Sequence, residues 1–176
     1  KVEAGTNITL TKNADGFKID AASGGAAGLE SGTGTDSMQS ASSLTTVAAS
    51  ASEADTIALG DGATASSGNN IAIGNSAQAT GSRTVAIGDS ANASGSRAVV
   101  VGASSTASSF SSCVFGAFST ASAEGATVVG GYGSSATQTD AIAVGKEADA
   151  LAAGAIAIGK LAQATATDAI ALGKDV

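Results

Sequence analysis

The sequence contains no histidine, no proline and no tryptophan, and it has a single cysteine. The absence of histidine removes the commonest general base and metal ligand. One cysteine excludes an intrachain disulfide framework and a four-cysteine zinc site. Aromatic residues make up only 3% of the chain, which excludes a conventional single-domain core of bulky side chains. The chain must bury small side chains in thin layers, or share apolar surface with another chain.

Positive charge is also scarce, because 8 Lys and Arg residues face 15 Asp and Glu residues, for a net charge of −7. This balance argues against binding to nucleic acid, which requires clustered Lys and Arg to neutralise phosphate. No run approaches the roughly 18 apolar residues of a membrane span, and no signal peptide is visible. We expect any segments for export or anchoring to lie outside this sequence.

What the sequence does contain is a repeat, in which a short apolar run ends in glycine. The repeat glycines are spaced by 14 residues except for one interval of 15, and they are Gly60, Gly74, Gly88, Gly102, Gly116, Gly130, Gly145, Gly159 and Gly173. A period of 14 is too short for helix-pair repeats and fits two short strands with two turns. The repeat therefore predicts an all-β solenoid in which each repeat is one rung, numbered 1 to 9 in chain order. Nine rungs stacked at strand spacing make a rod of roughly 40 Å.

Positions within a rung are counted from the repeat glycine. Positions −3 and −1 hold mainly Ile, Val or Leu and share one face of the first strand, because side chains alternate along a strand. Position −2, on the opposite face, is never polar: it holds Ala58, Ala72, Ala86, Val100, Val114, Val128, Ala143, Ala157 and Ala171. In the second strand, positions +3 and +5 are mostly Ala, as in Ala63 and Ala65, whereas +4 is polar. The polar +4 residues include Thr64, Gln78, Asn92, Thr106, Thr120, Asp149 and Gln163.

The first strand is thus apolar on both faces, while the second has one dry and one wet face. A strand that is apolar on both faces is usually buried on both. Within a rung, the Ala face of the second strand covers one face of the first strand, and the other face needs a second chain. We therefore predict an obligate oligomer with first strands inside. Two assignments of the −2 column remain open, since it lies either in the rung core or against the partner.

The turns carry their own signals. Position −5 often holds a turn former or a charged residue, such as Asp55, Asn69 or Asp140. We expect Gly68, Gly81 and Gly95, which precede strands, to occupy positions of positive φ. Rungs 5 and 6 contain unusual residues and the 15-residue interval, which predicts a bulge or small outward loop there.

The N-terminal part of the chain lacks the repeat. Residues 1–20 contain two strand-like runs around the turn at 13–16, which predicts a small β module or strand pair. Residues 21–52 are rich in Ser, Gly, Ala and Thr, which is typical of a linker or a poorly ordered segment. A packed loop covered by an oligomer is the alternative. The repeats then form the third unit, 53–176.

The recurring string resembles the head repeats of trimeric autotransporter adhesins of Gram-negative bacteria, the YadA-like head. It is seen, for example, over residues 67–81, SGNNIAIGNSAQATG. The resemblance covers about residues 54–176. It implies a left-handed parallel β-roll that assembles as a homotrimer, displayed on the bacterial cell surface and anchored to the outer membrane through other parts of the protein. Adhesins of this kind attach to host extracellular matrix, to host cells or to each other.

Several cations are candidates for a cationic strip that contacts an acidic matrix partner. Arg83 and Arg97 lie one rung apart, and Lys146, Lys160 and Lys174 form a column at +1. The alternative for these cations is a solvated face that keeps the rods soluble. Tyr132, with Phe110 and Phe118, is either an exposed contact or packing within an irregular rung. Cys113 is either a small buried apolar residue or a reactive, cross-chain thiol.

The sequence favours a non-enzymatic adhesin head that binds through many weak contacts on a rigid rod. We expect no catalytic residues, no metal and no cofactor, and no direct membrane contact by these residues. Carboxylate pairs such as Glu147 and Asp149 lie in turns or on a wet strand, so they are read as structural. Solenoid enzymes of the hexapeptide-repeat or polysaccharide-degrading type require another period or longer rungs. The remaining alternative is a passive spacer module of a larger adhesin or of a phage-fibre-like protein.

Overall fold

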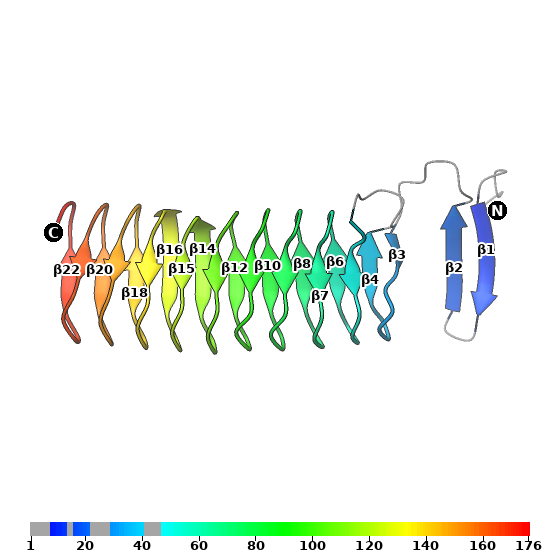
Figure 1. The fold of residues 1–176 in the computed structure, drawn as a ribbon, viewed down its shortest axis with the longest axis horizontal. Coiled ribbons are helices and arrows are strands. Elements are labelled where there is room, and N and C mark those ends of the chain that lie inside the picture. The colour runs from blue at the N-terminus through cyan, green and yellow to red at the C-terminus, as the bar shows by residue number, and fades with distance from the viewer. Residues whose placement is uncertain (1–7, 14–15, 22–28, 41–46) are drawn as a thin grey trace.

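The computed structural model describes residues 8–13, 16–21, 29–40 and 47–176. The repeats form a β-solenoid whose rungs follow one another along a single axis, from cyan to red in Figure 1. An 11-stranded sheet contains the first strand of each rung, and a 9-stranded sheet contains the second strands. Neighbouring strands in both sheets are parallel throughout the repeats. The predicted all-β solenoid is therefore confirmed.

The first sheet contains the three-residue runs that precede the repeat glycines, with two longer strands in rungs 5 and 6. Its strands are β3 (Leu29–Ser31), β4 (Met38–Ser40), β6 (Ile57–Leu59), β8 (Ile71–Ile73), β10 (Val85–Ile87), β12 (Val99–Val101), β14 (Cys113–Ala117), β16 (Thr127–Tyr132), β18 (Ile142–Val144), β20 (Ile156–Ile158) and β22 (Ile170–Leu172). The second sheet contains β5 (Ser50–Ala51), β7 (Thr64–Ala65), β9 (Gln78–Ala79), β11 (Asn92–Ala93), β13 (Thr106–Ala107), β15 (Thr120–Ala121), β17 (Ser135–Ala136), β19 (Asp149–Ala150) and β21 (Gln163–Ala164).

The register follows the 14-residue period directly. Ala86 pairs with Ala72 on one side and with Val100 on the other, so each column of the sequence becomes a ladder of equivalent side chains. Backbone hydrogen bonds link successive rungs outside the strands as well, for example from Ser90 N to Asn75 O at 2.8 Å. Each rung is therefore held mainly by the two rungs beside it.

The core lies between the two sheets and is lined by small side chains. Four positions per rung point inward: −4 and −2 from the first strand, and +3 and +5 from the second. The −2 column is completely buried in rungs 1 to 8, as are Ala63 and Ala65. The column that holds the largest inward side chain differs along the rod. It is −4 in rungs 1 to 3, with Thr56, Asn70 and Thr84, and −2 in rungs 4 to 6, with Val100, Val114 and Val128. Close-packed interiors require such compensation of volume.

Buried polar side chains in this core make hydrogen bonds to the backbone. Asn70 Nδ2 donates to the carbonyls of Ala79 (2.8 Å) and Gly81 (2.7 Å), while its Oδ1 accepts from Thr84 N (2.8 Å). At +3, where other rungs have Ala, three successive serines form a ladder: Ser119 N donates to Ser105 Oγ (3.1 Å) and Ser134 N to Ser119 Oγ (3.2 Å). These bonds offset the cost of burying the polar groups.

Two positions in every rung adopt the left-handed conformation, and these are −5 and +2. Asn69, Arg83 and Arg97 at −5 have φ of 63°, 59° and 60°. This explains the Asp, Asn and Gly residues of that column, which tolerate positive φ best. Our expectation that Gly68, Gly81 and Gly95 take positive φ was wrong, since the left-handed residue follows one or two positions later.

Gly81 and Gly95 are required for a different reason, which is close approach between rungs. A Cβ on Gly81 would lie 2.6 Å from the carbonyl carbon of Gly95, and a Cβ on Gly95 would lie 2.7 Å from Ser109 N. A Cβ on Gly68 would find nothing nearer than 3.8 Å, so that glycine is dispensable on steric grounds.

The repeat glycines form a ladder of their own, and the extra residue of the 15-residue interval is accommodated beside it. Gly88 has φ +136°, and a Cβ there would lie 2.8 Å from the Gly102 carbonyl oxygen. Between β14 and β16 the register shifts, so that Phe115 pairs with Val129 but Ala117 pairs with Tyr132. The predicted irregularity is thus a bulge at Gly130 and Gly131. Gly131 takes the place in the ladder, and Tyr132 becomes the +1 residue of rung 6.

The N-terminal region differs from the linker that we expected for residues 21–52. β4 pairs in parallel with β6, and β5 with β7, so this segment contributes a partial rung before rung 1. β3 then pairs antiparallel with β4 and covers the edge of the first sheet. A repeat search does not detect this rung because it lacks the glycine and the Ile-Ala-Ile pattern. Part of the expected linker, residues 22–28 and 41–46, lies outside the described residues.

The expected strand pair at the N-terminus is present as β1 (Ile8–Asn13) and β2 (Gly16–Ala21), which are antiparallel. Their register pairs Asn13 with Gly16, so the two strands flank the predicted turn. Residues 1–7 and 14–15 of the expected module lie outside the described residues. The expected unit 53–176 contains rungs 1 to 9, and the solenoid begins before it with the partial rung formed by β4 and β5.

Candidate functional site

The −3 and −1 columns form two apolar ladders on the outward face of the first sheet. In rungs 1 to 3 these side chains are partly exposed, and further along the rod Val101 is 37%, Phe115 45% and Ile158 38% exposed. We call these two columns the apolar strip. The −1 column is apolar from β6 to β22 and the −3 column is interrupted by Thr127 in β16, so the strip runs along all nine rungs. The larger side chains thus face outward, and the small −2 side chains face inward.

In the single chain the −2 column lies in the core of each rung, which is one of the two positions that the sequence left open. Ala58, Ala72, Ala86, Val100, Val114, Val128, Ala143 and Ala157 are all 0% exposed, and Ala171 packs against the same core from the last rung. The physical reason is the narrow gap between sheets, where Ala and Val fit opposite the Ala residues of +3 and +5. The face of the first sheet that stays partly exposed in the single chain is therefore the apolar strip.

The outward face of the second sheet is polar, as expected. The +4 side chains are partly or well exposed from Thr64 to Gln163. Partial burial raises the pKa of the Asp149 carboxyl, and a hydrogen bond with the Gln163 side chain offsets part of that rise. The face is a regular column of small hydroxyl, amide and carboxylate groups.

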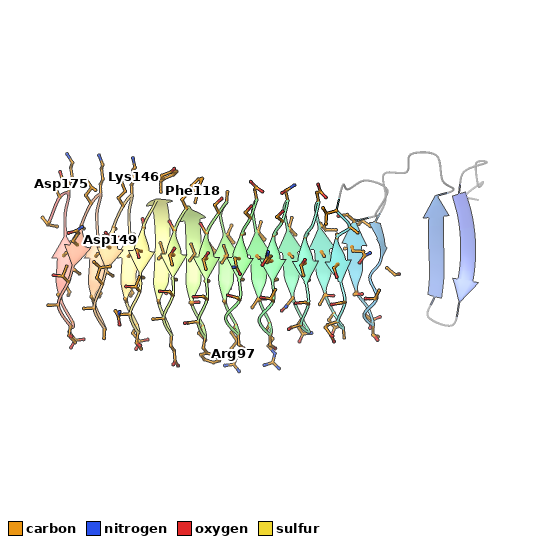
Figure 2. The ribbon with its side chains drawn as sticks, viewed as in Figure 1. Arg97, Phe118, Lys146, Asp149 and Asp175 are labelled. Carbon is orange, nitrogen blue, oxygen red and sulfur yellow. The ribbon has the colours of Figure 1, made fainter. Side chains whose placement is uncertain are left out.

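The turns of the rungs form two edges, and each edge is a hydrogen-bonded ladder. On the lysine edge, which consists of positions +1 and +2, Leu161 N donates to Lys146 O (2.9 Å) and Asp175 N to Lys160 O (2.9 Å). On the arginine edge, which consists of positions −6 and −5, Arg97 N donates to Ser82 O (2.8 Å). Figure 2 shows Lys146, Phe118 and Asp175 along one edge and Arg97 on the opposite edge.

The candidate cations are therefore divided between two edges and do not form one strip. Lys146 pairs with Glu147 at 3.3 Å, and Lys174 pairs with Asp175 at 3.4 Å, both at exposed positions. Arg97 lies over the ring of Phe110, 5.1 Å from its centroid. Lys160, between the two ion-paired lysines, and Arg83 have no ion pair among the residues that the structure describes.

The aromatic candidates also separate. Phe118 and Tyr132 stack on the lysine edge with ring centroids 4.7 Å apart and planes inclined by 41°. They are 51% and 53% exposed. Phe110 is on the arginine edge, where it is 43% exposed beneath Arg97. The three side chains thus make two aromatic sites on opposite edges of adjacent rungs.

Cys113 is partly buried and unpaired in the −3 column, within the apolar strip. Burial raises the pKa of its thiol, which lowers the thiolate fraction at neutral pH. Within the described ranges, no group of three or more Cys, Asp or Glu side chains has the arrangement of a metal site. A hollow at the N-terminal partial rung is lined by Leu29, Ser31, Ser37 and Met38, and none of these four described residues is acidic or basic.

Comparison with protein families now identifies this architecture. The family model for the YadA head domain repeat matches residues 51–77, 71–91, 79–105, 131–148 and 150–175, which together make up more than half of the chain. The chain belongs to the YadA head repeat family. The resemblance inferred from the repeat string is confirmed. No curated protein matches the chain.

The matches leave out residues 106–130, which contain Phe110, Cys113, Phe115 and Phe118. These are the rungs in which aromatic and sulfur side chains replace the aliphatic and small residues of the YadA head pattern. Membership in the YadA head family implies an adhesin-type protein exposed on the bacterial surface and attached to the outer membrane. The part of the chain that the structure describes contains no helix with the length and apolarity needed to cross a membrane.

Proposed function

We propose that this YadA-type head is a non-enzymatic adhesin module that attaches to host extracellular matrix or host cells as a rigid homotrimeric rod. The observation that carries the proposal is the apolar strip, which stays partly exposed along every rung of a single chain. A contiguous apolar surface of this length on a soluble protein marks an interaction site. Association through the strip covers it and leaves the polar second sheet outside.

A threefold arrangement suits the shape of the rung. Each roll is flat, with one apolar sheet face and one polar sheet face, so three rolls facing a common axis form a three-sided rod. The apolar strips then meet at the axis and the edges lie at the three corners. Every surface feature is repeated three times at the same height and again, with variation, along the rod. Multivalency of this kind raises avidity without tight individual contacts.

The first test is the mass of the folded protein in solution, by light scattering. A trimer supports the proposal, and a stable folded monomer contradicts it. The second test is solid-phase binding of the protein to collagen, fibronectin, laminin and whole host cells. Background binding to every ligand contradicts adhesion by these residues and favours a passive spacer, which is the alternative function.

Charge variants then test the candidate contacts. Arg83→Gln with Arg97→Gln removes two cations from one edge, and Lys146→Gln with Lys160→Gln removes two from the other. The matched control is Lys12→Gln with Lys18→Gln, which removes the same charge from strands β1 and β2, outside the roll. If the edges contact an acidic ligand, binding by the edge variants becomes weaker and less sensitive to salt, whereas binding by the control is unchanged.

A further inference from the structure

Residues of opposite charge lie on the two edges of the roll, where they cannot pair with each other within a single chain. On the lysine edge, position +1 is acidic in rungs 1 and 3 (Asp61, Asp89) and basic in rungs 7 to 9. On the arginine edge, position −5 is basic in rungs 3 and 4 and acidic in rungs 7 and 9 (Asp140, Asp168). The signs on the two edges are therefore opposite at similar heights around rung 3 and in rungs 7 to 9, whereas rung 1 has an aspartate on both edges (Asp55 and Asp61). Within one chain the edges are separated by the width of the roll (Figure 2).

The geometry of the proposed trimer, on which this inference rests, brings the two edges together. A threefold axis along the rod moves nothing along that axis, so the lysine edge of one chain meets the arginine edge of the next chain in the same direction. One turn of the solenoid rises by about 4.8 Å, and the two edges are half a turn apart. Each +1 residue therefore lies between the neighbour's −5 residues of the same rung and of the next rung.

This half-rung offset gives every cation of the roll an opposite charge on the neighbouring chain. Asp89 lies between Arg83 and Arg97 of the neighbour. Lys146 lies beside the neighbour's Asp140, between that carboxylate and its own Glu147. Lys160 and Lys174 both lie beside the neighbour's Asp168. Between the +1 and −5 columns one like-charged pair remains, Asp61 with Asp55, and both carboxylates accept hydrogen bonds within their own chain, from Val47 N and Asn69 Nδ2.

The exposed aromatic residues match in the same way. Phe118 at +2 and Phe110 at −6 both belong to rung 5, one on each edge. They are 51% and 43% exposed in the single chain. In the trimer each Phe118 faces the Phe110 of the neighbouring chain. The aromatic contact thus falls midway between the acidic and basic halves of each edge.

We propose that the lysine edge of each protomer binds the arginine edge of its neighbour through this series of charge pairs and the Phe110–Phe118 contact. The partner is a second copy of this chain, in the parallel orientation. The interface assigns Arg83, Arg97, Lys146, Lys160 and Lys174 to assembly and leaves the polar second sheet for ligands. Complementary charge across an interface contributes to correct pairing as well as to affinity.

Cross-linking tests the geometry with substitutions that leave the charges unchanged. Ala103 at +1 of rung 4 lies between the neighbour's Arg97 and Ser111, so Ala103→Cys and Ser111→Cys are combined in a Cys113→Ser background. Within one chain the strand between the edges spans roughly 15–20 Å, so a thiol cross-linker well below that length joins only different chains. We expect a covalent trimer on a denaturing gel. Ala103→Cys alone and Ser111→Cys alone should give no cross-link.

Absence of the covalent trimer in the double variant, in a sample shown to be trimeric, overturns the proposal. Dimers formed by either single variant also overturn it, because they require two identical edges to meet. A monomeric sample instead contradicts the proposed function itself, so the two failures are distinguishable before any cross-linker is added.

Charge reversal tests the energetics. Asp89→Arg places three cations together at each corner, and we expect the trimer dissociation constant to rise by about tenfold or more. Adding Arg83→Asp and Arg97→Asp should restore it to within about threefold of the unmodified protein. Gln78→Arg on the second sheet is the matched control and should leave assembly unchanged. Equal trimer stability in all four proteins, with lower binding to matrix proteins in the edge variants, would assign the cations to ligand contact and refute the pairing.

Discussion

Replacing glycines in and near the glycine ladder with alanine should lower the stability of the chain by amounts that can be estimated at three positions. Gly88→Ala places a Cβ 2.7 Å from the carbonyl carbon of Gly102 and 2.8 Å from its oxygen, in a residue with φ +136°. Gly130→Ala keeps the backbone strain, at φ +73°, but its Cβ meets nothing within 4 Å. Gly68→Ala has neither problem, since its φ is not positive and the nearest atom is 3.8 Å away. The three substitutions separate strain from collision.

The expected changes in the free energy of unfolding differ accordingly. Gly68→Ala should be neutral or stabilise the chain by about 0.4–1 kcal/mol, because alanine restricts the unfolded chain. Gly130→Ala should destabilise it by about 1–2 kcal/mol through the left-handed conformation alone. Gly88→Ala adds the separation of two rungs, which weakens hydrogen bonds such as Gly102 N to Ile87 O (2.8 Å). At about 0.5–1.5 kcal/mol for each of two such bonds plus about 1–3 kcal/mol of strain, the total is roughly 2–6 kcal/mol.

The assay is chemical unfolding of the three variants at one protein concentration, followed by circular dichroism of the β signal. We expect Gly68→Ala to be the most stable of the three variants, Gly130→Ala to be intermediate and Gly88→Ala to be the least stable. If Gly88→Ala unfolds at the same denaturant concentration as Gly68→Ala, the steric explanation is refuted, because the ladder would then have room that the structure does not show. Equal losses for Gly88→Ala and Gly130→Ala would mean that the inter-rung contact contributes nothing.

Three further predictions concern single side chains. Asn70→Ala leaves Thr84 N and two carbonyls without their buried partner, so unfolding should become easier by about 1–3 kcal/mol, whereas Asn75→Ala on the lysine edge should change little. The pKa of Asp149 is raised above its ordinary value of 3.8, so just above pH 3.8 the folded chain binds more protons than the unfolded chain. The free energy of unfolding therefore falls as the pH rises through this range. Asp149→Asn should raise the melting temperature at pH 7 and not at pH 3. Burial raises the pKa of Cys113, so its reaction with a disulfide reagent at pH 8 should be at least about tenfold slower in the folded protein than in denaturant.

Much of the fold follows from the columns of the sequence. The 14-residue period places every strand from β6 to β22, because a short apolar run ending in glycine has no comparable helical alternative. The bulge was located by the one interval of 15. The burial of Ala63 and Ala65 and the exposure of Gln78 follow from alternation along the second strand.

The other features of the fold depend on distances between strands, which the sequence pattern does not give. The −2 and −3 columns are both apolar, and only the narrow gap between sheets decides that Ala86 points inward while Val85 lies on the outer face. Asn70 is of a residue type common in turns, but its side chain is buried because its amide bonds to backbone groups in the core. The amide donates to Ala79 O and accepts from Thr84 N. β4 lacks the repeat pattern and is positioned by pairing with β6. The division of the cations between two edges follows from their positions, because −5 and +1 lie in the turns at the two ends of the first strand.

The direction of the inter-rung hydrogen bonds has a mechanical consequence. Bonds such as Ser90 N to Asn75 O join one rung to the next along the length of the solenoid, so a pull between the two ends loads the rung boundaries in series. In one chain the weakest boundary limits the load, and the register shift between β14 and β16 makes that boundary different from the others. In the proposed trimer, three parallel chains would place three boundaries at each height and share the force among them. Side-by-side assembly of this kind would set the tensile strength of the module as well as the coverage of its apolar surface.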